Sequence, residues 1–446
     1  MESTDQSVER DEYRLALIVP RTHMLLTERS GAVLCLPRIS LPKWTRPAEQ
    51  VQQIVREMWG MHVLTLDCLA RSQDALPCLA VQVLSPQLPD ALIANEIDRI
   101  TAPELNEQER ITLSAMMVGD AQERGPFSCV GWIDEAIAWL HTAVPGCEVL
   151  PNEIRQFNAS ARFALLRFSM RDGGKYWLKA TGEPNRHEYD ISILLSDICP
   201  QYLPPLVATR PDWNAWLMRD AGGRLEKGLS QPVREQAVSR LAELQKTTLS
   251  FTEDLIAAGA ADQRAGVLRN HLSQITEYLS DAMERQTSTK VPRLERHRLS
   301  ELQSTLEDVC FRMEDLGIPD TLISNDISPG NLLFDGSNVF FTDWCEAGIG
   351  NPFLSLRQLC VVAGGDDMAL RAVYRQCWLG ELSALQIDQA FAFMPLLAIL
   401  SYLYGRGEWL RSERRHSPNF ESYARSLARH MDREARNPQL LEVLCP

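Results

Sequence analysis

The sequence lacks the features expected of an exported or membrane protein. Its first residues are polar and acidic, unlike a signal peptide. We find no uninterrupted apolar run long enough to cross a bilayer. The eleven cysteines contain no C-x-x-C pair, and their odd number argues against a zinc module and against a disulfide framework. These absences predict a cytoplasmic protein with reduced thiols and no membrane partner.

Clustered positive charge is also scarce. The chain has 45 Lys and Arg against 59 Asp and Glu, a formal net charge of -14. Because contact with a nucleic-acid backbone needs clustered Lys and Arg, we expect no nucleic-acid partner. The 446 residues, 45% of them hydrophobic, suffice for two or three domains with ordinary cores.

One stretch of the sequence carries readable chemistry. Residues 324–334 read SNDISPGNLLF, with Asp326 and Asn331 five positions apart, and a strand-like run at 339–342 ends at Asp343. An Asp can accept a hydroxyl proton, while amide and carboxylate oxygens suit Mg²⁺. The pattern therefore indicates transfer of a phosphoryl group from a Mg-nucleotide. The alternative is a polar turn that matches D-x-x-x-x-N by chance.

The region upstream of this loop predicts a β-hairpin. Residues 162–168 and 175–180 alternate like strands, and Asp172-Gly173 between them is a turn signal. Lys179 falls late in the second strand, where its ammonium could reach nucleotide phosphates. Glu188, in the helical segment that follows, could hold Lys179 as an ion pair.

A second strand is expected at residues 216–220, WLMRD, followed by Gly222-Gly223 as a flexible connector. This is how the adenine-binding hinge between two lobes would look. Met218 and Arg219 in this segment are therefore candidate nucleotide contacts.

From about residue 149 to the C-terminus, the sequence resembles the aminoglycoside phosphotransferase family, which shares one fold with choline kinases and protein kinases. The order and rough spacing of several pieces match: YWLKA at 176–180, Glu188, WLMRD at 216–220, NDISPGNLL at 325–333 and FTDWCEAGIGNPF at 341–353. The resemblance implies a small β-rich lobe and a large helical lobe.

The resemblance also implies roles for these positions. Lys179 would contact nucleotide phosphates with support from Glu188, Asp326 would be the catalytic base, and Asn331 and Asp343 would ligate Mg²⁺. The expected cofactors are Mg²⁺ and ATP or GTP, and the expected partner is a small-molecule acceptor that the sequence does not identify. The competing class is a nucleotide-binding pseudokinase with a regulatory or partner-binding role. The sequence leaves the oligomeric state open.

Two departures from the family pattern bear on activity. The family usually has His-Gly ahead of the catalytic Asp, where this chain has Ser324 and Asn325. Since the His mainly supports the loop, its absence bears on the geometry of the catalytic loop more than on the reacting side chains. The nucleotide-covering loop is the second departure, because residues 158–161 contain no glycine.

The first 146 residues predict a separate β-β-α-β-β module. Strand-like runs lie at 13–19, 32–36, 63–66 and 78–84. A helix is expected from Pro47 to Gly60, because apolar residues follow a helical spacing and Gly60 is a plausible terminator. Those apolar residues are Val51, Ile54, Val55, Met58 and Trp59.

This order, with Arg56-Glu57 near the end of the helix, resembles a Nudix fold. A working Nudix helix needs several glutamates on one face to bind metal and activate water. The glutamate pair expected after Glu57 is replaced here by Gly60 and Met61. We therefore expect a hydrolytically inactive module, the alternative being an unrelated α/β domain.

Together these observations predict an α+β protein: a Nudix-like α/β domain followed by a protein-kinase-like two-lobed fold. The predicted boundaries are 1–146 for the Nudix-like domain, 149–220 for the small lobe and 221–446 for the helical lobe with the catalytic loop. Pro145-Gly146 is the expected linker.

Overall fold

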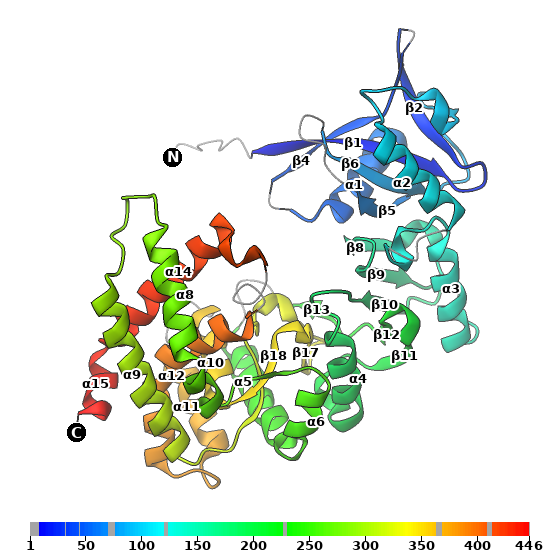
Figure 1. Cartoon of the computed structure of the whole chain (residues 1–446). Coiled ribbons are helices and arrows are strands. Elements are labelled where there is room, and N and C mark those ends of the chain that lie inside the picture. The colour runs from blue at the N-terminus through cyan, green and yellow to red at the C-terminus, as the bar shows by residue number, and fades with distance from the viewer. Residues whose placement is uncertain are drawn as a thin grey trace, which may run out of the picture. The chain divides into compact units, whose positions relative to one another are not determined.

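The computed structural model describes residues 9–31, 33–43, 45–69, 76–119, 124–225, 230–362, 368–407 and 413–445 (Figure 1). The chain divides into two compact units. Unit 1 comprises Met1–Tyr189 and Leu206–Asp220, and unit 2 comprises Asp190–Pro205 and Ala221–Pro446. Both units combine helices and strands, so the α+β class is confirmed. The three predicted domain boundaries stay predictions.

Unit 1 begins with a seven-stranded sheet in the order β3-β2-β1-β6-β5, in which β4 also pairs with β1 and β7 with β2. Helix α1 ends as predicted, because Gly60 adopts a left-handed conformation with φ of 67°. The four predicted strands correspond to β1, β3, β5 and β6, whereas β2, β4 and β7 were not predicted. The elements are β1 (Arg10–Val19), β2 (Met24–Ser30), β3 (Val33–Cys35), β4 (Arg38–Pro42), α1 (Pro47–Trp59), β5 (Val63–Cys68), β6 (Cys78–Val83), β7 (Ile93–Asn95), α2 (Glu107–Val118) and α3 (Trp132–Ala143).

The second sheet of unit 1 is antiparallel, with the order β11-β12-β10-β9-β8. The predicted hairpin is present as β9 and β10, and the amide of Gly174 donates to the Asp172 carboxylate in its turn at 2.9 Å. The predicted strand at 216–220 is β12. The elements are β8 (Arg155–Ala159), β9 (Ala164–Ser169), β10 (Lys175–Ala180), β11 (Leu206–Arg210) and β12 (Ala215–Arg219), together with the start of α4 (Glu188–Ile198).

One apolar core joins the two sheets of unit 1. It contains residues of the first sheet, such as Ile18 and Leu64, and residues of the second, such as Leu166 and Leu178. The buried amide of Gln156 in β8 adds polar links to the first sheet. Its Nε2 donates to the carbonyl of Thr65, and its Oε1 accepts from the Thr65 amide, both at 2.8 Å. The N-terminal module and the second sheet are therefore packed as one body.

Unit 2 is mainly helical, and its large core is lined by both its helices and its short strands. The helices are α5 (Gln231–Thr247), α6 (Thr252–Ala257), α7 (Ala265–Asn270), α8 (Leu272–Glu284), α9 (Arg296–Asp315), α10 (Phe353–Val362), α11 (Met368–Trp378), α12 (Ala384–Gly405), α14 (Pro418–Glu434) and α15 (Pro438–Leu444). The strands are β13 (Gly223–Arg224), β14 (Ala261–Asp262), β15 (Thr321–Ser324), β16 (Leu332–Phe334), β17 (Val339–Phe341) and β18 (Ala347–Gly350).

Helix α12 is long and apolar enough to cross a membrane, which the sequence analysis overlooked. Length and composition are the only grounds, and 56% of its most apolar window is buried within the protein. Core helices give the same pattern, so the expected absence of a membrane partner stays a prediction.

The predicted flexible connector at 222–223 is in fact paired. Gly223–Arg224 forms β13, which is antiparallel to β16. Gly222 has φ of 97°, and a Cβ at this position would lie 2.0 Å from the carbonyl oxygen of Phe334. Because only glycine fits so close to another backbone, Gly222 allows the chain to approach Phe334 just before β13 begins.

Candidate functional site

The loop after β15 brings Asp326 and Asn331 together in unit 2. Strand β15 is buried, and the hydroxyl of Ser324 at its end accepts from the Asp326 amide at 3.2 Å. The amide nitrogen of Asn331 donates to the backbone oxygen and to the carboxylate of Asp326, both at 2.9 Å. Both hydrogens of the Asn331 amide are thus engaged, which fixes the orientation of that side chain.

Asn325 supports this loop from behind, at the position where the resemblance expects the glycine of a His-Gly pair. Its Nδ2 donates to Oε1 of Gln263 at 2.9 Å, and its Oδ1 accepts from the Ser401 hydroxyl at 3.3 Å. All three side chains are buried. Buried polar groups that are satisfied in this way hold their segments in one arrangement. Where the family has His-Gly, this chain therefore has a buried hydrogen-bond network that includes Asn325, Gln263 and Ser401.

Gly405→Ala tests this network. The new Cβ would lie 2.7 Å from Nδ2 of Asn325 and 2.8 Å from Nε2 of Gln263. Alanine ordinarily favours a helix, but overpacking a buried network costs ~1–3 kcal/mol. We expect a lower urea midpoint for the full chain. Gly223→Ala is the control, since nothing lies within 4 Å of the position that its Cβ would take, and equal midpoints would contradict the expectation.

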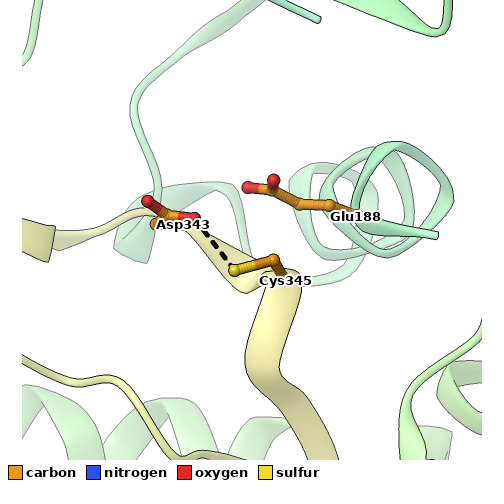
Figure 2. Close-up of side chains that lie close together, drawn as sticks. All are labelled: Glu188, Asp343 and Cys345. Carbon is orange, nitrogen blue, oxygen red and sulfur yellow. Dashed lines mark hydrogen bonds between the residues drawn. The ribbon is translucent and has the colours of Figure 1, made fainter. Parts of the chain in front are cut away.

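Asp343 follows β17 and adjoins the same loop. The amide of Thr342 donates to the backbone oxygen of Asn331 at 3.0 Å, which ties the two segments. Asp343 has φ of 68°, a left-handed conformation uncommon outside glycine and often found at functional sites. The thiol of Cys345 donates to Oδ1 of Asp343 at 3.3 Å (Figure 2).

Electrostatics show that the carboxylates of this region interact. Burial raises the pKa of Asp326, and the charge of Asp343 raises it further, whereas the hydrogen bond from Asn331 and the Arg406 guanidinium lower it. The net effect makes Asp326 a stronger proton acceptor than an ordinary aspartate.

Glu346 and Arg406 complete this charged cluster, and the sequence analysis missed both. They form an ion pair. Burial raises the pKa of Glu346, Arg406 lowers it, and Asp326 and Asp343 raise it. Glu346 could have been suspected from its place three residues after Asp343. Arg406, at the end of α12, has no local sequence signal.

Lys179 and Glu188 form the predicted ion pair, in unit 1. Lys179 lies in β10 and Glu188 begins α4, where its side chain is almost wholly buried. The Lys179 ammonium also lies 5.8 Å from the ring centroid of Trp216. A buried carboxylate thus holds the ammonium in a defined position.

Met218 and Arg219 lie at the end of β12. Met218 pairs with Trp177 across the sheet, and its sulfur accepts from the Trp216 indole at 3.2 Å. Arg219 is exposed. Trp177 was not among the predicted site residues. It lies two residues before Lys179 and therefore on the same face of β10. Strand alternation alone could have identified it.

Glu57 lies near the end of α1, exposed to solvent, and accepts from Nε2 of Gln53 at 2.9 Å. Gly60 caps the helix, and the Met61 side chain is buried. No carboxylate therefore follows Glu57 at the positions where the Nudix pattern needs one. The likeness to a Nudix fold stays a prediction.

No protein-family model and no curated protein sequence matches this chain. Solved structures similar to it include a choline kinase from Cryptosporidium parvum Iowa II, with 13% identity, a TM-score of 0.48 and coverage of 70% of this chain and 98% of that chain. An ethanolamine kinase from Plasmodium vivax has 14% identity and a TM-score of 0.48, covering 78% and 98%. A macrolide 2'-phosphotransferase from Brachybacterium faecium has 15% identity and a TM-score of 0.43, covering 66% and 97%. At these values the likeness assigns neither fold nor function to the chain.

Proposed function

We propose that this protein transfers the terminal phosphoryl group of ATP or GTP, with Mg²⁺, to a hydroxyl of a small-molecule acceptor. One observation carries the proposal. The loop after β15 holds Asp326, whose carboxyl has a raised pKa, beside Asn331, whose Nδ2 donates to the backbone oxygen and to the carboxylate of Asp326. A proton acceptor and a neutral oxygen ligand are thereby fixed relative to each other, as phosphoryl transfer requires.

The side chains of unit 2 fit Mg²⁺. The side-chain oxygen of Asn331 accepts no hydrogen bond from the described residues, and Asp343 adds an anionic oxygen. The charge of Asp343 raises the pKa of Asp326, and both aspartates raise the pKa of Glu346, while Arg406 is the cation that offsets them. Three neighbouring carboxylates against one guanidinium favour a further cation, and hard oxygen donors suit magnesium.

In the proposed reaction, Asp326 orients the acceptor hydroxyl and takes its proton. The acceptor oxygen forms a bond to the terminal phosphorus, while the bond from that phosphorus to the bridging oxygen breaks and the nucleoside diphosphate leaves. Asn331 and Asp343 would hold Mg²⁺, and the bound ion would neutralise charge on the phosphates. Lys179, paired with Glu188, stays the predicted phosphate contact, and Met218 and Arg219 stay the predicted contacts of the base.

Asp326→Ala should reduce turnover by ~10²–10⁴-fold and leave nucleotide affinity nearly unchanged, because it removes the proton acceptor and no metal ligand. Turnover can be measured with Mg-ATP and Mg-GTP against a panel of hydroxyl-bearing metabolites. The exposed Asp254→Ala is the matched control. Near-normal turnover in Asp326→Ala would exclude the assigned role. Nucleotide binding without turnover in the native protein would favour the pseudokinase alternative.

Asp343→Asn should weaken nucleotide binding and turnover together, by about tenfold or more, because it removes an anionic metal ligand. Calorimetric titration of nucleotide with Mg²⁺ and with EDTA measures the metal-dependent part, and Asp254→Asn serves as control. If the native protein and the variant bind nucleotide equally with and without Mg²⁺, the metal site is not there.

We also propose that the N-terminal module does not hydrolyse nucleoside diphosphate compounds. A lone glutamate at position 57 cannot both ligate metal and activate water. The full chain carrying Asp326→Ala, which removes phosphotransfer, can be assayed with nucleotide sugars and Mg²⁺ or Mn²⁺, and no nucleoside monophosphate should appear. Glu57→Gln in the otherwise native chain should leave phosphotransfer intact. Metal-dependent hydrolysis that Glu57→Gln abolishes would make the protein bifunctional.

A further inference from the structure

Unit 1 contains a polar groove between the N-terminal module and the second sheet. Its volume is about 700 Å³, and it is lined by one face of α1, by the segment that enters β8, and by β9. This volume is in the range of small-molecule binding sites. All of its lining residues belong to unit 1, whereas Asp326 and Asp343 belong to unit 2.

Three arginines from three elements line this groove: Arg56 in α1, Arg155 in β8 and Arg167 in β9. Among the described residues, none of the three guanidinium groups has a hydrogen bond or an ion pair. Nε of Arg167 is shielded from solvent and still lacks a partner there. Arg155 and Arg167 lie opposite each other in the β8–β9 pair. Guanidinium groups whose N–H donors lack partners favour an anion that can accept from them.

Carboxylates line the same groove without neutralising these arginines. Glu49, Glu57 and Glu153 are part of its wall, yet within the described part of the chain none forms an ion pair with a groove arginine. Long side chains of opposite charge on one surface commonly pair. Here the arginines and the glutamates line the same groove without pairing. The arginines can therefore bind an anionic group of a ligand, and the glutamates can accept from its hydrogen-bond donors.

The walls of the groove are held in fixed register. Oε1 of Gln52 in α1 accepts from the backbone amide of Gln156 in β8 at 2.8 Å, and its Nε2 donates to the carbonyl of Val63 at 2.9 Å. The shared apolar core lies beneath β9, whereas Val51 and Val55 of α1 pack in a second apolar cluster. A ligand would therefore meet a preorganised surface, which lowers the cost of ordering side chains and backbone on binding.

We propose that this groove binds a phosphate ester of a small polyol. The forked guanidinium groups of Arg56, Arg155 and Arg167 match phosphate oxygens in pairs. The glutamates can accept hydrogen bonds from ligand hydroxyls. Binding does not depend on the proposed phosphotransfer.

The groove is lined by β9, which pairs with β10, the strand that carries Lys179. Arg167 pairs with Trp177 across the hairpin, and its guanidinium lies 5.8 Å from the ring centroid of Trp177. The Trp177 indole in turn donates to Asp220 at 2.6 Å. A phosphate bound at Arg167 would therefore lie beside the β9–β10 pair, at the cross-strand position two residues before Lys179.

Calorimetric titration of the full chain with ribose 5-phosphate and with inorganic phosphate tests the proposal. We expect saturable binding of ribose 5-phosphate that is weakened about tenfold or more by Arg56→Gln and by Arg155→Gln, since each removes a charge-assisted contact. Both arginines are exposed, so the substitutions spare the core. Arg99→Gln, an exposed arginine of unit 1 away from the groove, should leave binding unchanged.

Several results would overturn the assignment. Absence of saturable binding would do so, as would equal weakening by Arg99→Gln. If Lys179→Ala abolished binding while Arg56→Gln and Arg155→Gln retained it, the phosphate site would lie at Lys179 and not in the groove. Inorganic phosphate that binds as tightly as ribose 5-phosphate would remove the polyol from the proposal.

Discussion

The buried amide of Gln263 is the group on which the candidate catalytic loop depends. Its Oε1 accepts from Asn325 and Ser401, and its backbone amide donates to the carbonyl of Ile349 at 2.7 Å. Gly348 and Gly405 have no Cβ and so leave room for its side chain. One residue thereby joins three segments, which lead directly to the carboxylates and the guanidinium of the charged cluster. Since an unpaired buried polar group costs ~1–3 kcal/mol, this arrangement is stable only when every partner is present.

The same geometry explains how two carboxyl groups, those of Asp326 and Glu346, are accommodated in a largely buried environment. Asp326 and Glu346 both have raised pKa values because burial disfavours their charged forms. Arg406 offsets part of this cost through its pair with Glu346. Arg406 directly follows Gly405, the residue of α12 that lies against Gln263 and Asn325. The C-terminal end of α12 therefore contributes both to the support of the loop and to the balance of its charges.

The sequence predicted what is encoded locally. Alternation identified β10 and hence Lys179, and the five-residue spacing of Asp326 and Asn331 predicted that they would meet. Contacts between distant positions were not predicted: Gln263 and Asn325 are 62 positions apart, and Asn325 and Ser401 are 76 apart. Gln and Ser carry no periodicity or turn signal that would reveal such a pairing. The glycines at 222 and 223 were misread because glycine signals flexibility and close backbone approach equally well.

The shared core of unit 1 changes how the N-terminal module should be understood. Leu64 and Ile18 of the first sheet belong to the same apolar cluster as Leu166 and Leu178 of the second. Leu178 adjoins Lys179, so the module contributes to the packing beneath the strand that presents the ammonium. Removing the module would expose that apolar surface to water, at ~25 cal/mol for each Å². The module thus has a structural reason to be present whether or not it performs chemistry, and a ligand in the groove at its edge would act on a sheet that is already part of the same core.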